Sequence, residues 1–91
     1  MALPKGIDAA FDSFASSVYG SEILERKLIE LMALSNSVAL DCAPCMRHHS
    51  EEARKRGATE QEVWLAVAVA MTISAGKNRV KAREALEAPG R

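Results

Sequence analysis

The chain has 91 residues, of which 48% are hydrophobic but only 4% aromatic. A chain of this length buries about 60 to 65% of its unfolded surface, so we expect one small domain, residues 1–91, and not two. Twelve basic residues balance twelve acidic ones, which leaves no electrostatic footprint for nucleic acid or for an anionic membrane.

The first part of the chain predicts two helices separated by a short turn. Apolar residues recur at helical spacing and predict a first helix over about residues 7–18. Gly20 suits the end of this helix, and Ser21 suits the N-cap of a second helix over about residues 22–38. We expect the second helix to bury a stripe that consists of Leu24, Leu28, Leu31, Ser35 and Val38.

A third helix is expected to begin at Cys42 and to end near Arg56. Asp41 suits the N-cap of this helix, because a short carboxylate can accept hydrogen bonds from the first backbone amides. Gly57 can adopt the left-handed conformation that stops a helix. The two cysteines therefore lie at the start of the predicted third helix.

A capping box, Thr59 with Glu62 three residues later, predicts the start of a fourth helix. From Val63 to Ile73 this helix is apolar on nearly every side, and a small domain can cover such a helix only by packing it against another subunit. We therefore expect a homo-oligomer. Gly76 is expected to break the helix, so that residues 77–87 form a fifth, charged helix.

Two segments bear on the compartment in which the protein works. Residues 1–6 lack the basic and apolar regions of a secretory signal peptide. The apolar run from Val63 to Gly76 is too short to span a bilayer. We expect a cytoplasmic protein with no membrane partner, and in that reducing compartment a cysteine pair is more often redox-active or metal-binding than a structural cross-link.

Both cysteines and both histidines of the chain lie between Asp41 and His49. On a helix, Cys42, Cys45 and His49 share one stripe. A helix start favours the thiolate form of a cysteine, and two cysteines three residues apart can close a disulfide with little movement. His49 lies one turn beyond Cys45 and is within reach as a proton acceptor. The pattern predicts a redox-active thiol pair.

Other interpretations of this cluster stay open. A zinc site is disfavoured, because four ligands within eight residues of one helix cannot surround a tetrahedral ion. A thioredoxin-like fold would need a strand before Cys42, and none is predicted. Buried inert cysteines are common in general, but less so beside a histidine on the same stripe. His48 points off that stripe, and we expect it at the surface or behind the site.

The segment from Glu30 to His49 resembles the AhpD-like branch of the carboxymuconolactone decarboxylase superfamily. The likeness rests on a glutamate twelve residues before the first cysteine, the sequence Cys-Ala-Pro-Cys, and a histidine four residues after the second cysteine. It continues through the apolar helix from Val63 to Gly76. The resemblance implies an all-α fold of about five helices around a central helical hairpin, assembly into trimers or hexamers, and thiol-dependent reduction of hydroperoxides with no cofactor or metal.

Carried over by position, the resemblance assigns roles to four residues. Cys42 and Cys45 would be the redox pair, with Cys45 the attacking thiol and Cys42 its resolving partner. His49 would transfer protons. On a helical wheel, Glu30 is expected to be a solvated partner of Arg26, but the resemblance implies that its carboxylate reaches the cysteines.

The resemblance also names the expected reaction partners, a small hydroperoxide and an external dithiol reductant. Two alternatives belong to other functional classes. One is a non-enzymatic oligomeric module that senses redox state or holds a metal. The other is a lyase of the carboxymuconolactone decarboxylase type, although such decarboxylases generally do not depend on a CxxC pair.

Overall fold

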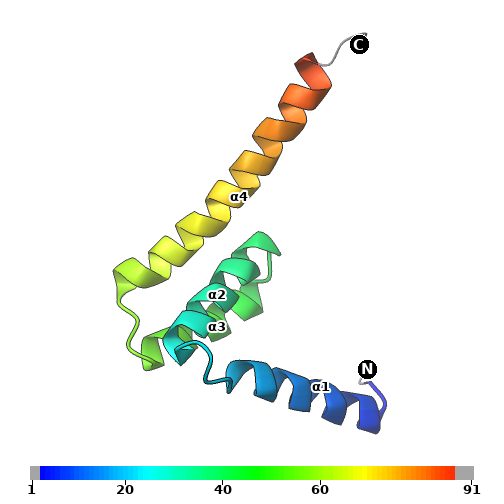
Figure 1. Ribbon diagram of the computed structural model, residues 1–91, viewed down its shortest axis with the longest axis vertical. Coiled ribbons are helices and arrows are strands. Elements are labelled where there is room, and N and C mark those ends of the chain that lie inside the picture. Colours follow the sequence, from blue (N-terminus) through cyan, green and yellow to red (C-terminus); the bar gives the residue numbers. More distant parts are fainter. Residues whose placement is uncertain (1–2, 88–91) are drawn as a thin grey trace.

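The computed structural model describes residues 3–87, and within this range the chain forms α-helices and no strand. The four helices are α1 (Lys5–Tyr19), α2 (Arg26–Ala39), α3 (Ala43–Lys55) and α4 (Glu60–Glu87). Helices α2 and α3 form a central hairpin, and α4 packs along α2 (Figure 1). The predicted all-α fold, with the cysteines at the start of the third helix of a central hairpin, is confirmed.

Local hydrogen bonds explain where α3 ends and α4 begins. Gly57 has a φ of 93°, a left-handed backbone conformation that glycine adopts more easily than residues with a side chain. Thr59 Oγ1 accepts from the backbone N–H of Glu62 at 3.1 Å, and the Glu62 carboxylate accepts from the backbone N–H of Thr59 at 2.8 Å. The predicted helix stop and the predicted capping box are both confirmed.

Two predicted helix boundaries are wrong. Helix α2 begins at Arg26 and not at Glu22, because the Ser21 hydroxyl accepts a hydrogen bond from the backbone N–H of Ile23 in a local turn and does not cap a helix. Helix α4 runs without a break through Gly76 to Glu87. A single glycine costs a helix only about 1 kcal/mol relative to alanine, so the described chain has four helices and not five.

The core lies where α2, α3 and α4 meet, and it confirms part of the predicted stripe of α2, because Leu31 and Val38 pack against the core and Ser35 donates to the Ala66 carbonyl at 2.9 Å. Its centre is Leu34 with Val63 and Ala66 of α4. Of the predicted stripe, Leu24 and Leu28 are 42% and 44% exposed. Helix α4 covers the face of α2 that carries Leu34, whereas Glu30 faces His49 of α3, and Leu24 and Leu28 lie outside both contacts. The buried residues of α2 are Glu30, Leu34 and Ser37.

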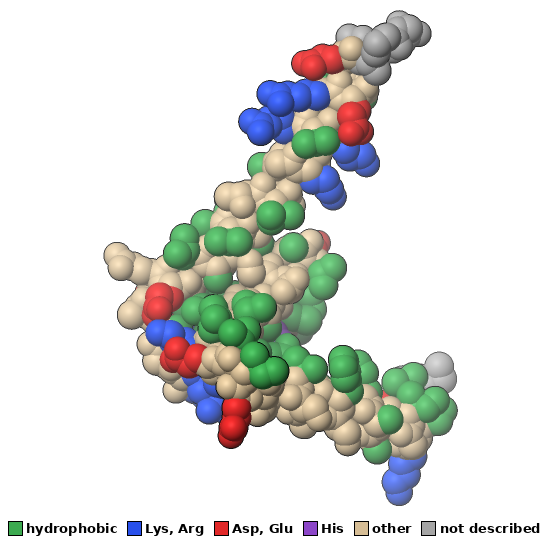
Figure 2. Space-filling view, in the orientation of Figure 1, with side chains coloured by type: hydrophobic (Ala, Val, Ile, Leu, Met, Phe, Trp, Pro, Cys, Tyr) green, Lys and Arg blue, Asp and Glu red, His purple; other side chains and the backbone are tan. Residues whose placement is uncertain are grey.

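The chain is extended for its length. Its radius of gyration is 17.4 Å, whereas a compact chain of this length has a radius of about 12 Å. Helix α1 and the distal part of α4 project away from the hairpin in different directions (Figure 1). Helix α1 has no buried residue, and hydrophobic side chains are exposed along both arms (Figure 2). Within the described residues, no helix is both long and apolar enough to cross a bilayer.

Candidate functional site

Cys42 and Cys45 are joined by a disulfide at the start of α3, with their Cα atoms 5.2 Å apart. Both residues are half-buried. Cys45 lies in the first turn, where Pro44 sets the helical backbone angle without losing a helical hydrogen bond. The disulfide that the short spacing of the two cysteines allowed is therefore present at the start of α3.

Cys42, and not Asp41, is the N-cap of α3. The Cys42 sulfur accepts from the backbone N–H of Cys45 at 3.3 Å. The predicted capping role of Asp41 is wrong because this residue makes the turn between the helices, with a φ of 56° that aspartate tolerates better than most residues. The helix start that favours a thiolate therefore acts directly on the Cys42 sulfur.

Glu30 of α2 contacts His49 and is almost fully buried, with 1% of its surface exposed. One carboxylate oxygen lies 2.8 Å from His49 Nδ1, and the other accepts from Arg26 Nε at 2.8 Å. Burial raises the pKa of Glu30, but the hydrogen bonds from His49 and Arg26 outweigh it and hold the pKa below its ordinary value. The pairing with Arg26 is present as expected, but the expectation that Glu30 is solvated is wrong.

The ionised carboxylate fixes which nitrogen of His49 carries the proton. A carboxylate only accepts hydrogen bonds, so His49 Nδ1 must donate to Glu30. Neutral His49 then has its lone pair on Nε2, and this atom alone can take up a proton. His49 is one helical turn beyond Cys45, a spacing at which side chains on a helix are neighbours.

Tyr19, the last residue of α1, lies against His49, and the sequence reasoning missed it. The two rings stack with their centroids 5.4 Å apart and their planes inclined by 15°. The Tyr19 hydroxyl is 3.5 Å from His49 Nε2, and the Arg26 guanidinium carbon is 5.7 Å from the centre of the Tyr19 ring. Burial and the Glu30 charge raise the pKa of Tyr19, although Arg26 lowers it. The signal available beforehand was that this is the only tyrosine of the chain, placed at a helix end.

An open cavity of about 380 Å³ adjoins these side chains. Tyr19, Arg26, Glu30 and His49 line it, together with His48. His48 is exposed and meets the His49 ring edge to face, with centroids 4.9 Å apart. Within residues 3–87, no three histidine, cysteine, aspartate or glutamate side chains are grouped as a metal ion would require.

The proteins to which this chain is similar include one family and, among its individual relatives, the two that follow. The sequence pattern of the family described as "Carboxymuconolactone decarboxylase family" matches residues 6–88. A protein of Paracoccus denitrificans, described as uncharacterized protein 4 in the cox locus, is 30% identical over 80 residues, which are 88% of this chain and 72% of the relative. A crystal structure of a protein from Methanobacterium thermoautotrophicum, a structural genomics target, is similar to this structure with a TM-score of 0.80 and 36% sequence identity. The match covers 88% of this chain and 91% of the other chain. Neither relative's description names an activity.

Proposed function

The chain belongs to the carboxymuconolactone decarboxylase family, and from this premise we propose that it is a thiol-dependent oxidoreductase of the AhpD-like type that reduces hydroperoxides. One observation carries the proposal. The Cys42–Cys45 disulfide lies one helical turn from His49, and the buried Glu30 carboxylate holds His49 Nδ1 at 2.8 Å. A redox-capable thiol pair and an oriented proton acceptor are the two groups that such a reaction needs.

The first half of the cycle forms a sulfenic acid. Cys45 gives its proton to His49 Nε2, and its sulfur attacks the terminal oxygen of the hydroperoxide. The S–O bond forms as the O–O bond breaks, and the departing alkoxide takes the proton back from His49 and leaves as an alcohol. The cysteine sulfur is oxidised and the peroxide is reduced by two electrons.

The second half of the cycle forms the disulfide. The Cys42 sulfur, whose position at the N-cap favours its thiolate, attacks the sulfenic sulfur of Cys45. The S–S bond forms as the S–O bond of the sulfenic acid breaks, and the hydroxide that leaves takes up the proton that Cys42 lost on becoming a thiolate, which gives water. Two thiols and one hydroperoxide thus yield a disulfide, an alcohol and water. An external dithiol then reduces the disulfide by exchange, which returns both protons to the cysteines.

Glu30 supports the proton transfer by orienting His49. When His49 accepts a proton at Nε2, its other nitrogen stays bonded to the buried Glu30 carboxylate. Arg26 holds the second carboxylate oxygen, so the acceptor cannot rotate away without breaking a charge-assisted bond of 2.8 Å. The arrangement orients the base.

The proposal includes assembly into a homo-oligomer, a trimer or a hexamer. The isolated chain exposes 7088 Å², whereas a compact monomer of its mass exposes about 5,200 Å². The excess of roughly 1,900 Å² is more than the area of about 800 Å² that each partner contributes to a standard interface. Copies of the chain that cover the arms of one another would remove part of this excess surface from water, including exposed apolar side chains of the arms.

The decisive experiment measures hydroperoxide consumption by the reduced protein with a small dithiol as the reductant. We expect Cys45→Ser and Cys42→Ser to lose turnover entirely, because each removes one sulfur of the cycle. His49→Ala should slow turnover by about 10²- to 10⁴-fold, the usual contribution of a positioned base. Wild-type turnover no faster than that of free thiol would contradict the proposal and would favour a redox-sensing or metal-holding module.

The family match also favours a second candidate, a lyase that opens or decarboxylates a lactone. In this reaction His49 and Glu30 would act as the acid–base pair and the cysteines would be spectators. The two candidates differ in one readout, because a lyase should keep its activity in Cys42→Ser and Cys45→Ser. Activity on a lactone that survives both substitutions would favour the lyase.

A further inference from the structure

Tyr19 provides the side-chain contacts by which α1 meets the site. Helix α1 has no buried residue. At the end of this helix the Tyr19 ring is stacked on His49 and lies under the Arg26 guanidinium. An aromatic ring in this position orders the imidazole plane, and the cation–π contact orders Arg26 as well.

The Tyr19 hydroxyl lies on the one side of His49 that remains available. Nδ1 is committed to the Glu30 carboxylate, so the proton that His49 accepts and releases in the proposed function must be bound at Nε2. The hydroxyl is 3.5 Å from this atom. A phenol can donate to the lone pair of neutral imidazole and can accept from the N–H of imidazolium, so it can remain a partner in both states. Contacts of this kind are often long before substrate binds.

The surroundings leave the hydroxyl in its protonated form. The groups that face the His49 ring are Glu30 and Arg26 on α2, Tyr19 on α1 and His48 on α3. Burial and the Glu30 charge raise the pKa of Tyr19, so the phenol keeps its proton at neutral pH. Tyr19 and His49 both line the open cavity of about 380 Å³.

We propose that Tyr19 is a positioning residue of this site, whose hydroxyl orients His49 through a hydrogen bond at Nε2. This inference rests on the proposed function for its catalytic meaning. Its structural content, a hydrogen bond from a phenol to one defined imidazole nitrogen, can be tested without any turnover.

The test compares Tyr19→Phe with the wild type in the oxidised protein by ¹⁵N NMR of the imidazole nitrogens. Only two histidines are present, so a His48→Gln variant assigns both rings. Tyr19→Phe keeps the stacked ring and removes only the hydroxyl. We expect the Nε2 resonance of His49 to lose its hydrogen-bond shift while the Nδ1 resonance stays in place. In the reduced protein we expect kcat/KM for hydroperoxide to fall by about 2- to 10-fold, the range that one hydrogen bond accounts for.

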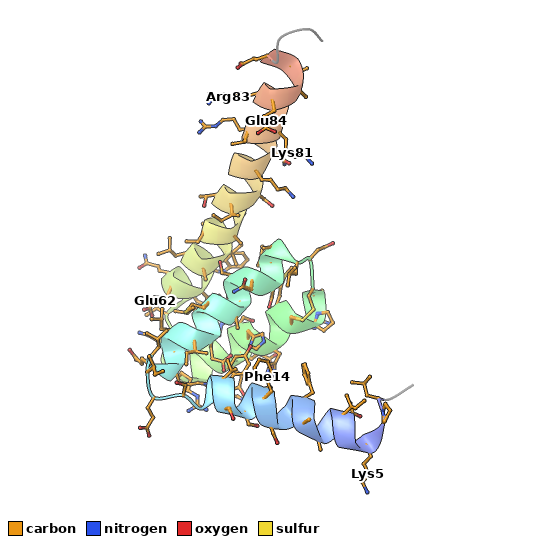
Figure 3. The ribbon with its side chains drawn as sticks, turned by 45° about the vertical axis from the view of Figure 1, so that its right-hand side comes forward. Lys5, Phe14, Glu62, Lys81, Arg83 and Glu84 are labelled. Carbon is orange, nitrogen blue, oxygen red and sulfur yellow. A yellow bond between two sulfur atoms is a disulfide. The ribbon has the colours of Figure 1, made fainter. Side chains whose placement is uncertain are left out.

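A matched control comes from the same helix. Phe14 is an exposed aromatic residue of α1 on a different groove, so Phe14→Leu should change neither the His49 resonances nor the rate (Figure 3). Tyr19→Leu removes the ring as well and should lower the rate further. Far-ultraviolet circular dichroism checks that each variant keeps its helices.

The outcomes separate this inference from the proposed function. An unmoved Nε2 resonance in Tyr19→Phe overturns the inference, whether or not the rate falls, because any rate loss would then not act through His49. A shifted Nε2 resonance together with a slower peroxidase supports it. A shifted resonance in a protein whose wild type consumes no hydroperoxide supports the positioning contact and removes the proposed function alone.

Discussion

The α2–α3 hairpin and the arms, which are formed by α1 and by α4 from Ile73 onward, differ in the side chains that they bury. The hairpin buries the Glu30 carboxylate and the Ser37 hydroxyl, and every buried side-chain nitrogen or oxygen among the described residues has a partner. The arms instead leave large apolar side chains in water, such as Phe11 at 62% and Ile73 at 67% exposure.

This difference shows which part of the structure is complete in one chain. A buried carboxylate is stable only if its partners are already in place, and here Arg26 and His49 supply them from within the hairpin. The apolar side chains of the arms have no such internal partners. The site is therefore built by a single chain, whereas the arms are suited to contact with further copies of it.

The largest effect is expected where the arms would meet another copy. Ile73→Glu places a charge on the exposed apolar side of α4 and should weaken self-association by at least about 100-fold, because an unpaired buried carboxylate costs several kcal/mol. Light scattering coupled to gel filtration measures the mass directly. The control is Lys81→Gln on the charged end of the same helix, which should leave the mass unchanged (Figure 3). A wild-type chain that stays monomeric at micromolar concentration would show that the arms are complete without a partner.

A smaller effect is expected from the hairpin. Glu30→Gln leaves Arg26 and His49 without their carboxylate and should lower the free energy of unfolding by about 2 to 3 kcal/mol. Urea unfolding at one fixed protein concentration measures the loss, since self-association also contributes to apparent stability. Glu60→Gln, which breaks only the exposed pair with Arg54, is the matched control and should show no measurable change.

The pH dependence of the same variant gives the sign of the Glu30 contribution. The folded-state pKa of Glu30 is below its ordinary value of 4.5. Its stabilising contribution is therefore fully present above the unfolded-state pKa and is lost as the pH falls through the lower, folded-state pKa. The stability difference between the wild type and Glu30→Gln should shrink as the pH is lowered below about 4.5. A difference that stayed constant down to pH 2 would mean that the Glu30 charge does not stabilise the hairpin.

The smallest effect tests the arm at Gly76. No atom lies within 4 Å of the place where a Cβ would be added, and the backbone there is helical. Gly76→Ala should raise the free energy of unfolding by about 0.5 to 1 kcal/mol, because alanine loses less backbone entropy in a helix. Thermal unfolding measures this gain. A loss of stability, accompanied by a lower assembled mass, would instead show that another copy of the chain packs closely against Gly76.

Much of the site was predictable because its signals are local. The CxxC spacing on a helix start allowed a disulfide, and His49 follows Cys45 by one turn of the same helix. Burial of Glu30 was not predictable from periodicity, since a glutamate four residues after an arginine usually forms a surface ion pair with it. Only the family resemblance suggested that Glu30 belongs to the site. Tyr19 was missed altogether, because its partner is thirty residues away in the sequence.

The sequence by itself determined the features that depend on residues within about four positions of one another. The capping box at Thr59, the stop at Gly57 and the cysteine pair at the start of α3 are of this kind, because their hydrogen bonds and their bridge close within one helical turn. Only the tertiary structure decided which face of α2 meets α3. That choice buries Glu30 and not Leu28, and it brings Glu30 to His49 from nineteen residues away, because burial depends on the packing of whole helices and not on the pattern along one of them.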